Sequence, residues 1–324
     1  MSSLFRLEFD PRPLDQKINI GDRIMLMGSC FTEHIYERLQ AFKFQSLQNP
    51  HGVLFNPMSI FTALHHYVDQ KHIADDELFE EQGVWRNWYF HSSLSRADRK
   101  MTSDAMNHAI IKGSAFLKTA DWLILTLGSS FVYHFEDRIP VSNCHKVSMT
   151  KFKKRMMSPD NIVEQFEAIY RKIHSINPGL KWMVTISPVR HLRDGFVENN
   201  RSKAVLVHAV DKICSSFPEV QYFPSYELII DDLRDYRFYA EDMVHPNYLA
   251  TKYVWEKLVQ SGFEGRAKEV MKELDQINAA RQHTPLHPDS EEHRKFKLKF
   301  KTLVEDLMVR FPDMDLSKEL QYFS

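Results

Sequence analysis

The chain has 324 residues, of which 43% are hydrophobic and 26% are charged, and its formal net charge is −1. This is the composition of a globular protein, and a net charge near zero gives no reason to expect a nucleic-acid partner. Three cysteines cannot all pair with one another and show no metal-ligand spacing. We therefore expect reduced thiols, a cytoplasmic location and no metal or other cofactor.

Short apolar runs alternate with segments of helical periodicity along most of the chain. The runs at 24–27, 122–127 and 182–186 are bounded by turn residues, which is typical of strands that are covered on both faces. A helix with Ser158 as its N-cap is predicted between the last two runs, and another apolar stripe follows residue 245. This alternation predicts an α/β fold with a parallel sheet flanked by helices.

Two parts of the chain depart from this alternation. Residues 60–115 are less regular and rich in aromatic side chains, and they form either an insertion that lines a substrate cleft or a surface excursion with a small core of its own. From residue 266 the sequence becomes charged and helical. We therefore expect a main domain at 1–265 and a helical C-terminal extension at 266–324, through which oligomers can form.

No segment of the chain predicts insertion into a membrane or export. The longest apolar runs have the length of strands and are far too short to span a bilayer. The first ten residues lack the basic start and the apolar core of a secretory signal. We therefore expect no membrane span and no secretory signal.

The turn after the first apolar run carries the candidate nucleophiles. Gly28 ends this predicted strand, and Ser29 and Cys30 follow it at the start of a helix. Active sites of parallel α/β sheets lie beyond the carboxyl ends of the strands, and the N–H groups at a helix start suit a developing oxyanion. We therefore expect Ser29 or Cys30 to attack the substrate from this turn.

A carboxylate and an imidazole stand three residues apart near the end of the main domain. Asp242 precedes His245, and the pair lies just before an amphipathic segment. At this spacing the carboxylate of Asp242 can orient the imidazole, and His245 can act as the base that deprotonates a nucleophile. A nucleophile early in the chain and an acid–base pair late in it together indicate a hydrolase.

These motifs resemble those of a known family. Gly28-Ser29-Cys30-Phe31 is similar to the Gly-Ser-Cys-Phe-Ala motif that names the GSCFA family, with Thr32 in place of the usual alanine. Further stretches that resemble the family are 50–57, 141–146, 187–191, 223–227 and 235–239, together with Asp242 and His245. The resemblance covers roughly residues 20–260. It implies an SGNH (GDSL-like) hydrolase fold, in which a flavodoxin-like parallel sheet is flanked by helices.

The resemblance also implies roles for individual residues. Its register places Cys30 at the position of the nucleophile and leaves Ser29 as the alternative. The N–H groups of Cys30 and Gly52 are the expected donors to the oxyanion. Related hydrolases use an asparagine as a third donor, and this asparagine is absent from its expected place. Ser130 or Asn143 is therefore expected to replace it.

Two basic residues, Arg190 and His191, follow the run at 182–186 and are expected to bind substrate, since an arginine can hold a carboxylate or a phosphate. The whole set predicts a hydrolase or acyltransferase that acts on an ester or thioester of a small molecule through an acyl-enzyme intermediate. Water as the acceptor gives hydrolysis, whereas an alcohol or amine gives transfer. A non-catalytic ligand-binding module on the same fold is one alternative. A scaffold that binds partners through its C-terminal helices is another.

Overall fold

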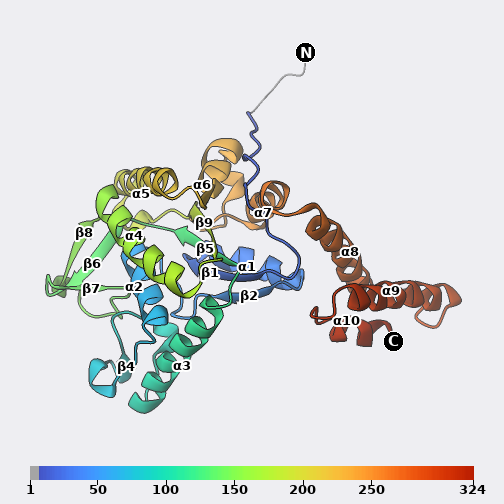
Figure 1. The fold of residues 1–324 in the computed structure, drawn as a ribbon, viewed down its shortest axis with the longest axis horizontal. Coiled ribbons are helices and arrows are strands. Elements are labelled where there is room, and N and C mark those ends of the chain that lie inside the picture. The colour runs from blue at the N-terminus through green and yellow to red at the C-terminus, as the bar shows by residue number, and fades with distance from the viewer. Residues whose placement is uncertain (1–6) are drawn as a thin grey trace.

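A central parallel sheet organises the computed structural model, which describes residues 7–324 (Figure 1). Its five strands lie in the order β10-β9-β5-β1-β2. Read from β2 and numbered by their place in the chain, this is the flavodoxin-like order 2-1-3-4-5, so the predicted α/β fold is confirmed. Residues 1–6, on which the expectation of no secretory signal partly rests, lie outside the described residues. The strands are β1 (Arg23–Gly28), β2 (Gln45–Gln48), β5 (Trp122–Leu127), β9 (Lys181–Ile186) and β10 (Val220–Phe223).

Helices cover both faces of the sheet because its strands are apolar on both sides. Along β1, Ile24 and Leu26 belong to one buried cluster, whereas Met25 and Met27 belong to another. All six residues of β5 are buried. The helices that contribute to the first cluster include α1 (Phe31–Ala41), α7 (Tyr248–Gly262) and α8 (Gly265–Gln282). Those of the second cluster are α2 (Pro57–Val68), α3 (Arg99–Leu117), α4 (Pro159–Ile176) and α5 (Phe196–Ser216).

The range 60–115 contains two helices of the main core, α2 and α3. Helix α2 has Asn56 as its N-cap, whose side chain accepts the Ser59 N–H at 2.8 Å, and Pro57 occupies its first position. Side chains of both helices pack in the same cluster as those of β5. The two ends of this range therefore belong to the main core. The hairpin of β3 (Phe79–Glu81) and β4 (Val84–Arg86) lies between the two helices.

A second sheet, which is antiparallel and has the strand order β7-β6-β8, follows β5. Trp88 stacks on Phe79 of the hairpin at 3.9 Å between ring centroids and on Phe135 of this sheet at 4.5 Å. The hairpin and the antiparallel sheet are therefore joined by one aromatic cluster. The strands are β6 (Phe131–Phe135), β7 (Ile139–Val141) and β8 (Phe152–Met156). The short helical segments are Asp75–Glu77, Ser92–Leu94, Met149–Lys151, Leu192–Asp194, α6 (Ser225–Glu227), Leu228–Leu233 and Tyr236–Phe238.

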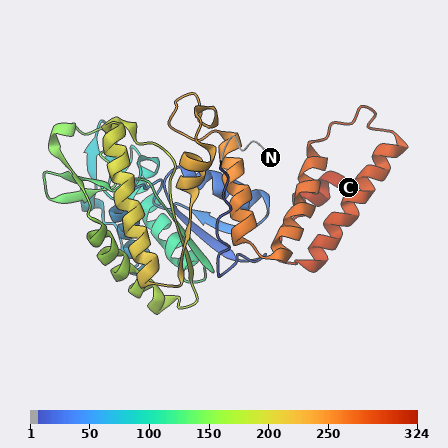
Figure 2. The same cartoon turned by 90° about the horizontal axis from the view of Figure 1, so that it is seen from above.

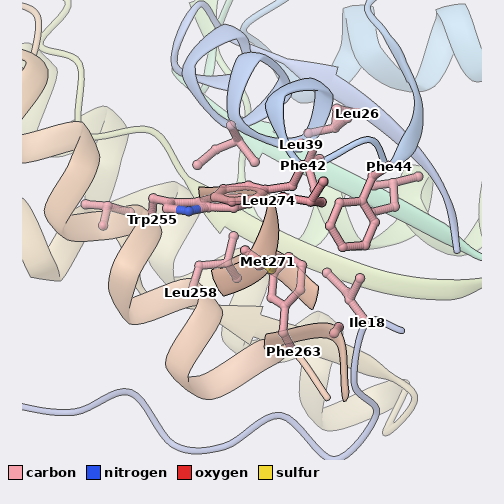
Figure 3. Packing of buried hydrophobic residues seen from close by; sticks show 14 of the residues in the cluster. Ile18, Leu26, Leu39, Phe42, Phe44, Trp255, Leu258, Phe263, Met271 and Leu274 are labelled. Carbon is pink, nitrogen blue, oxygen red and sulfur yellow. The ribbon is translucent and has the colours of Figure 1, made fainter. Parts of the chain in front are cut away.

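The C-terminal helices begin close to the predicted boundary but share the core of the main domain. In Figure 3, Met271 and Leu274 of α8 lie beside Trp255 and Phe42, whose rings are stacked at 5.9 Å. Helix α8 therefore attaches the extension to the main domain through apolar packing. Helices α9 (Glu291–Arg310) and α10 (Ser317–Phe323) continue from α8 at one end of the molecule (Figure 2).

A buried ion cluster adds a second attachment for this extension. Glu319 of α10 is 2% exposed and accepts from Lys43 at 3.0 Å and from Arg281 at 2.6 Å. Lys43 follows α1, whose N-cap is the candidate nucleophile Cys30. The last helix of the chain is therefore tied by charge to the end of the helix that carries the site.

Candidate active site

The turn after β1 places Cys30 at the carboxyl edge of the sheet. Gly28 permits this turn, because its φ is +143° and a Cβ there would lie 2.2 Å from the Thr126 carbonyl oxygen. The Gly28 N–H donates to the Asn49 side chain at 2.8 Å, and the Ser29 N–H donates to the Thr126 carbonyl at 3.1 Å. Since Thr126 belongs to β5, the turn lies between β1 and β5. The strand order reverses at this point, and ligands bind there in sheets of this class.

Cys30 and Ser29 differ in their accessibility. Ser29 is 1% exposed, whereas Cys30 is partly exposed at the start of α1. Burial raises the pKa of the Cys30 thiol, and the Glu33 carboxylate raises it further. The N–H groups of Cys30 and Phe31 and the charge of Lys203 lower this pKa. Of the two candidate nucleophiles, the Cys30 side chain is the one that a substrate can reach.

Asp242 and His245 form the predicted pair. The distance from His245 Nδ1 to Asp242 Oδ2 is 2.6 Å, and Asp242 Oδ1 accepts the N–H groups of Val244 and His245. These hydrogen bonds lower the pKa of Asp242 to about 2, so that the carboxylate stays ionised at neutral pH. An ionised carboxylate accepts the Nδ1–H of a neutral imidazole, which leaves the lone pair on Nε2. Both side chains are about half exposed and accessible to a substrate.

The acid–base pair lies at the same edge of the sheet as Cys30. His34 stands on α1 one turn after Cys30. Its pKa is lowered mainly by burial and to a smaller extent by the positive charge of His245. Val244 and Cys30 pack against the same buried cluster. Within residues 7–324 no hydrogen bond joins Cys30 to His245. The thiol and the imidazole therefore lie at one edge of the sheet and are not hydrogen-bonded to each other.

Arg190 holds the loop that carries this pair. Its N–H donates to the Val244 carbonyl at 3.3 Å. Its guanidinium lies 4.1 Å from the centroid of the Tyr239 ring and 4.9 Å from that of Tyr236. These contacts give Arg190, which was expected to bind substrate, a part in positioning the loop.

His191 lies over the end of β5. Its backbone N–H donates to the Asn199 side-chain oxygen at 2.9 Å, and its ring centroid lies 5.3 Å from that of Phe55. A Cβ on Gly128 would approach His191 Nε2 to 3.1 Å, so the imidazole stands directly beside this glycine. His191 therefore lines the same edge of the sheet as the nucleophile turn.

Three of the residues expected to donate to the oxyanion form other hydrogen bonds, Gly52 and Ser130 through their donor groups and Asn143 through its side-chain oxygen. The Gly52 N–H donates to the Asn49 carbonyl at 2.7 Å. The Ser130 hydroxyl and N–H both bind the hydroxyl of Ser202, at 3.1 and 2.8 Å. The Asn143 side-chain oxygen accepts an N–H two residues further on at 2.8 Å. The N–H groups at the start of α1 are the donors that lie beside the sulfur of Cys30.

Lys203 is a further residue of this edge. The polar stretch 199–203 has the sequence character of a loop, but the structure places it within α5. Lys203 is 2% exposed, and its Nζ donates to the carbonyl oxygens of Gly128 and Ser187. Its position three residues before Leu206 and seven before Val210, on the apolar stripe of the helix, is the sequence signal that predicts a buried lysine.

The described part of the chain was also searched for metal-binding clusters and membrane spans. Residues 7–324 contain no group of three or more histidine, cysteine, aspartate or glutamate side chains arranged to hold a metal ion. None of the helices in this range combines the length and the apolar character that crossing a bilayer requires.

Comparisons with known proteins identify the family. Residues 23–258 match the GSCFA family, and residues 274–324 match the C-terminal domain of GSCFA domain proteins. No curated protein matches the chain. Solved structures that resemble it include a carbohydrate esterase family 3 protein from Talaromyces cellulolyticus and an acetyl xylan esterase from the rumen bacterium Butyrivibrio proteoclasticus. Both are 10% identical to the chain, with TM-scores of 0.35 and 0.33.

The first alignment covers 79% of this chain and 99% of the Talaromyces protein, and the second covers 82% of this chain and 66% of the Butyrivibrio protein. The family match spans most of the sequence, from β1 to α7. The chain therefore belongs to the GSCFA family.

Proposed function

We propose that this GSCFA-family chain is a hydrolase or acyltransferase of SGNH type, which acts on an ester or thioester through an acyl group bound to Cys30. The observation that carries the proposal is the 2.6 Å contact between His245 Nδ1 and Asp242 Oδ2, at the sheet edge where Cys30 begins α1. A carboxylate that fixes an imidazole is the arrangement with which a nucleophile is activated.

In the proposed reaction, His245 Nε2 takes the proton from the Cys30 thiol. The sulfur then attacks the carbonyl carbon of the substrate, and the N–H groups at the start of α1 stabilise the oxyanion. Collapse of this intermediate releases the leaving group, to which His245 returns the proton. Water or another acceptor, deprotonated by the same imidazole, then attacks the thioester and frees Cys30.

The proposed chemistry requires a reduced thiol at position 30. Cys30, Cys144 and Cys214 are all unpaired, which fits a reducing compartment such as the cytoplasm. The substrate proposed is a small molecule that carries an acyl group. We further propose that contacts between copies of the chain, where they form, use the C-terminal helices α9 and α10.

Release of p-nitrophenol from acyl esters, and of free thiol from acyl thioesters, tests the proposal. We expect turnover by the wild type and none by Cys30→Ala or His245→Ala, while circular dichroism shows an unchanged fold. His72→Ala is the matched control, because His72 is also exposed but stands outside the site. Full turnover by the His245→Ala variant would contradict the mechanism.

A second candidate function is a ligand-binding module without catalysis. It is favoured by the hydrogen bonds that already engage the N–H of Gly52 and both the N–H and the hydroxyl of Ser130, two of the residues expected to donate to the oxyanion. This candidate predicts that the protein binds acyl-bearing small molecules, as calorimetry would show, while electrophilic esters leave Cys30 unmodified. Acylation of Cys30 would reject it.

A further inference from the structure

A buried lysine lies at the ends of two central strands. The Nζ of Lys203 donates at 2.6 Å to the carbonyl oxygens of Gly128 and Ser187, which directly follow β5 and β9. These two acceptors use both N–H groups of a neutral amine. The remaining position on the nitrogen carries either a lone pair or the third proton of an ammonium group. No carboxylate of residues 7–324 forms an ion pair with it.

The thiol of Cys30 is the ionisable group whose charge acts on Lys203. Burial lowers the pKa of Lys203 to about 7, and a negative charge on Cys30 opposes this effect. Conversely, burial raises the pKa of the thiol, and a positive charge on Lys203 lowers it. The other titratable groups around the pair are Glu33 on α1, His191 at the end of β5, and Tyr226, whose ring centroid lies 5.8 Å from Nζ.

Burial therefore disfavours a charge on either group alone, whereas opposite charges on both groups favour one another. The carboxylate of Glu33 is negative and raises the pKa of the thiol, so it disfavours a thiolate at Cys30. Lys203 Nζ is held at the Gly128 carbonyl, two residues beyond the Thr126 carbonyl that accepts the Ser29 N–H, so its positive charge lies at the strand end where Cys30 stands and acts on the thiol.

We propose that Lys203 is the charge partner of Cys30 and that its ammonium group stabilises the thiolate. In this step the S–H bond breaks, the electron pair stays on the sulfur, and the proton passes to His245, while Lys203 carries a proton taken from solvent. Lys203 is thus a positioning residue that acts through Cys30. Its part in acyl transfer rests on the function proposed above, but its effect on the thiol does not.

The test measures the reactivity of the thiol and needs no acyl substrate. Alkylation of Cys30 by iodoacetamide is followed by peptide mass across a range of pH for the wild type, Lys203→Met and Ser202→Ala. Ser202 is a matched control, because it is also 2% exposed and binds the β5–β6 loop through its hydroxyl without carrying a charge.

At neutral pH we expect Lys203→Met to react at least about tenfold more slowly, which is the effect of one pKa unit, with its profile displaced to higher pH. Ser202→Ala should keep the wild-type profile. A Lys203→Met protein that folds and is alkylated with the wild-type profile would overturn the proposal.

A reciprocal measurement leaves Lys203 in place and holds even if Lys203→Met does not fold. Isotope-labelled lysine side chains are titrated by NMR in the wild type and in Cys30→Ser, whose hydroxyl does not ionise in this range. We expect the lysine resonance that titrates near pH 7 to shift to lower pH in Cys30→Ser. An identical titration in both proteins would overturn the proposal. If the titration of Lys203 depends on Cys30 but acyl substrates never acylate Cys30, the proposed function would be rejected while the charge pairing of Lys203 with Cys30 would stand.

Discussion

Substitution of Gly28 by alanine tests the turn that positions the nucleophile. The φ of Gly28 is +143°, a value that L-residues rarely adopt, and holding alanine there costs about 1–3 kcal/mol. The added Cβ would also lie 2.2, 2.8 and 2.9 Å from the O, C and N atoms of Thr126. These are backbone atoms of β5, so relief requires β1 and β5 to separate, at a further cost of about 1–3 kcal/mol.

We therefore expect Gly28→Ala to lower the free energy of unfolding by about 4 kcal/mol, a large part of the 5–15 kcal/mol that is usual for a folded protein. Urea unfolding followed by the fluorescence of the buried Trp122 and Trp182 measures this difference. Gly265→Ala is the control, because φ at Gly265 is ordinary and a Cβ there would meet nothing within 4 Å. A Gly28→Ala protein within about 1 kcal/mol of the wild type would refute the reasoning.

Three further predictions concern charge. Glu319→Gln, which removes the buried carboxylate between Lys43 and Arg281, should lower the free energy of unfolding by about 2 kcal/mol in urea, since both cations are partly exposed. Burial lowers the pKa of His145 to about 4, so the unfolded chain binds a proton there that the folded chain lacks between about pH 6.5 and 4. Stability should therefore fall on acidification through this window, and His145→Gln should reduce the slope by about 1.4 kcal/mol per pH unit. Asp242→Asn should lower turnover at least about 100-fold in the thioester assay, because the imidazole loses the acceptor that fixes its Nδ1–H.

Each of these predictions has a control or a contradicting result. Glu291→Gln removes an exposed carboxylate of α9 and should leave stability within about 0.5 kcal/mol of the wild type. An unchanged pH slope in His145→Gln would show that this histidine does not stay neutral in the folded chain. Wild-type turnover in Asp242→Asn would show that the carboxylate does not serve the imidazole.

The sequence predicts the sheet and the acid–base pair because both depend on local patterns. The continuous apolar run of β5 has the pattern of a strand buried on both faces, and the structure confirms it. The three-residue spacing of Asp242 and His245 is short enough for one loop to bring the side chains together. The glycine at position 28 likewise predicts a turn with a conformation that other residues avoid.

Other features depend on contacts that a sequence pattern does not contain. The Gly52 N–H donates to the Asn49 carbonyl within a turn, and this local hydrogen bond decides whether the N–H is free to face a substrate. The spacing of Lys203 places it on the apolar side of α5, but the two carbonyl oxygens that its Nζ binds are brought to it only by the packing of α5 against the strand ends. The helices α2 and α3 join the core although the segment between them interrupts the alternation of strands and helices.

Intact-protein mass spectrometry after brief exposure to p-nitrophenyl esters and acyl thioesters tests the central claim most directly. The account predicts an added acyl group on the peptide that contains Cys30, its absence from Cys30→Ala, and its slow formation in His245→Ala. An adduct on Ser29 would contradict the assignment of the nucleophile. If the wild type and Cys30→Ala both turned over these substrates and neither carried an acyl adduct, covalent catalysis by this site would be contradicted.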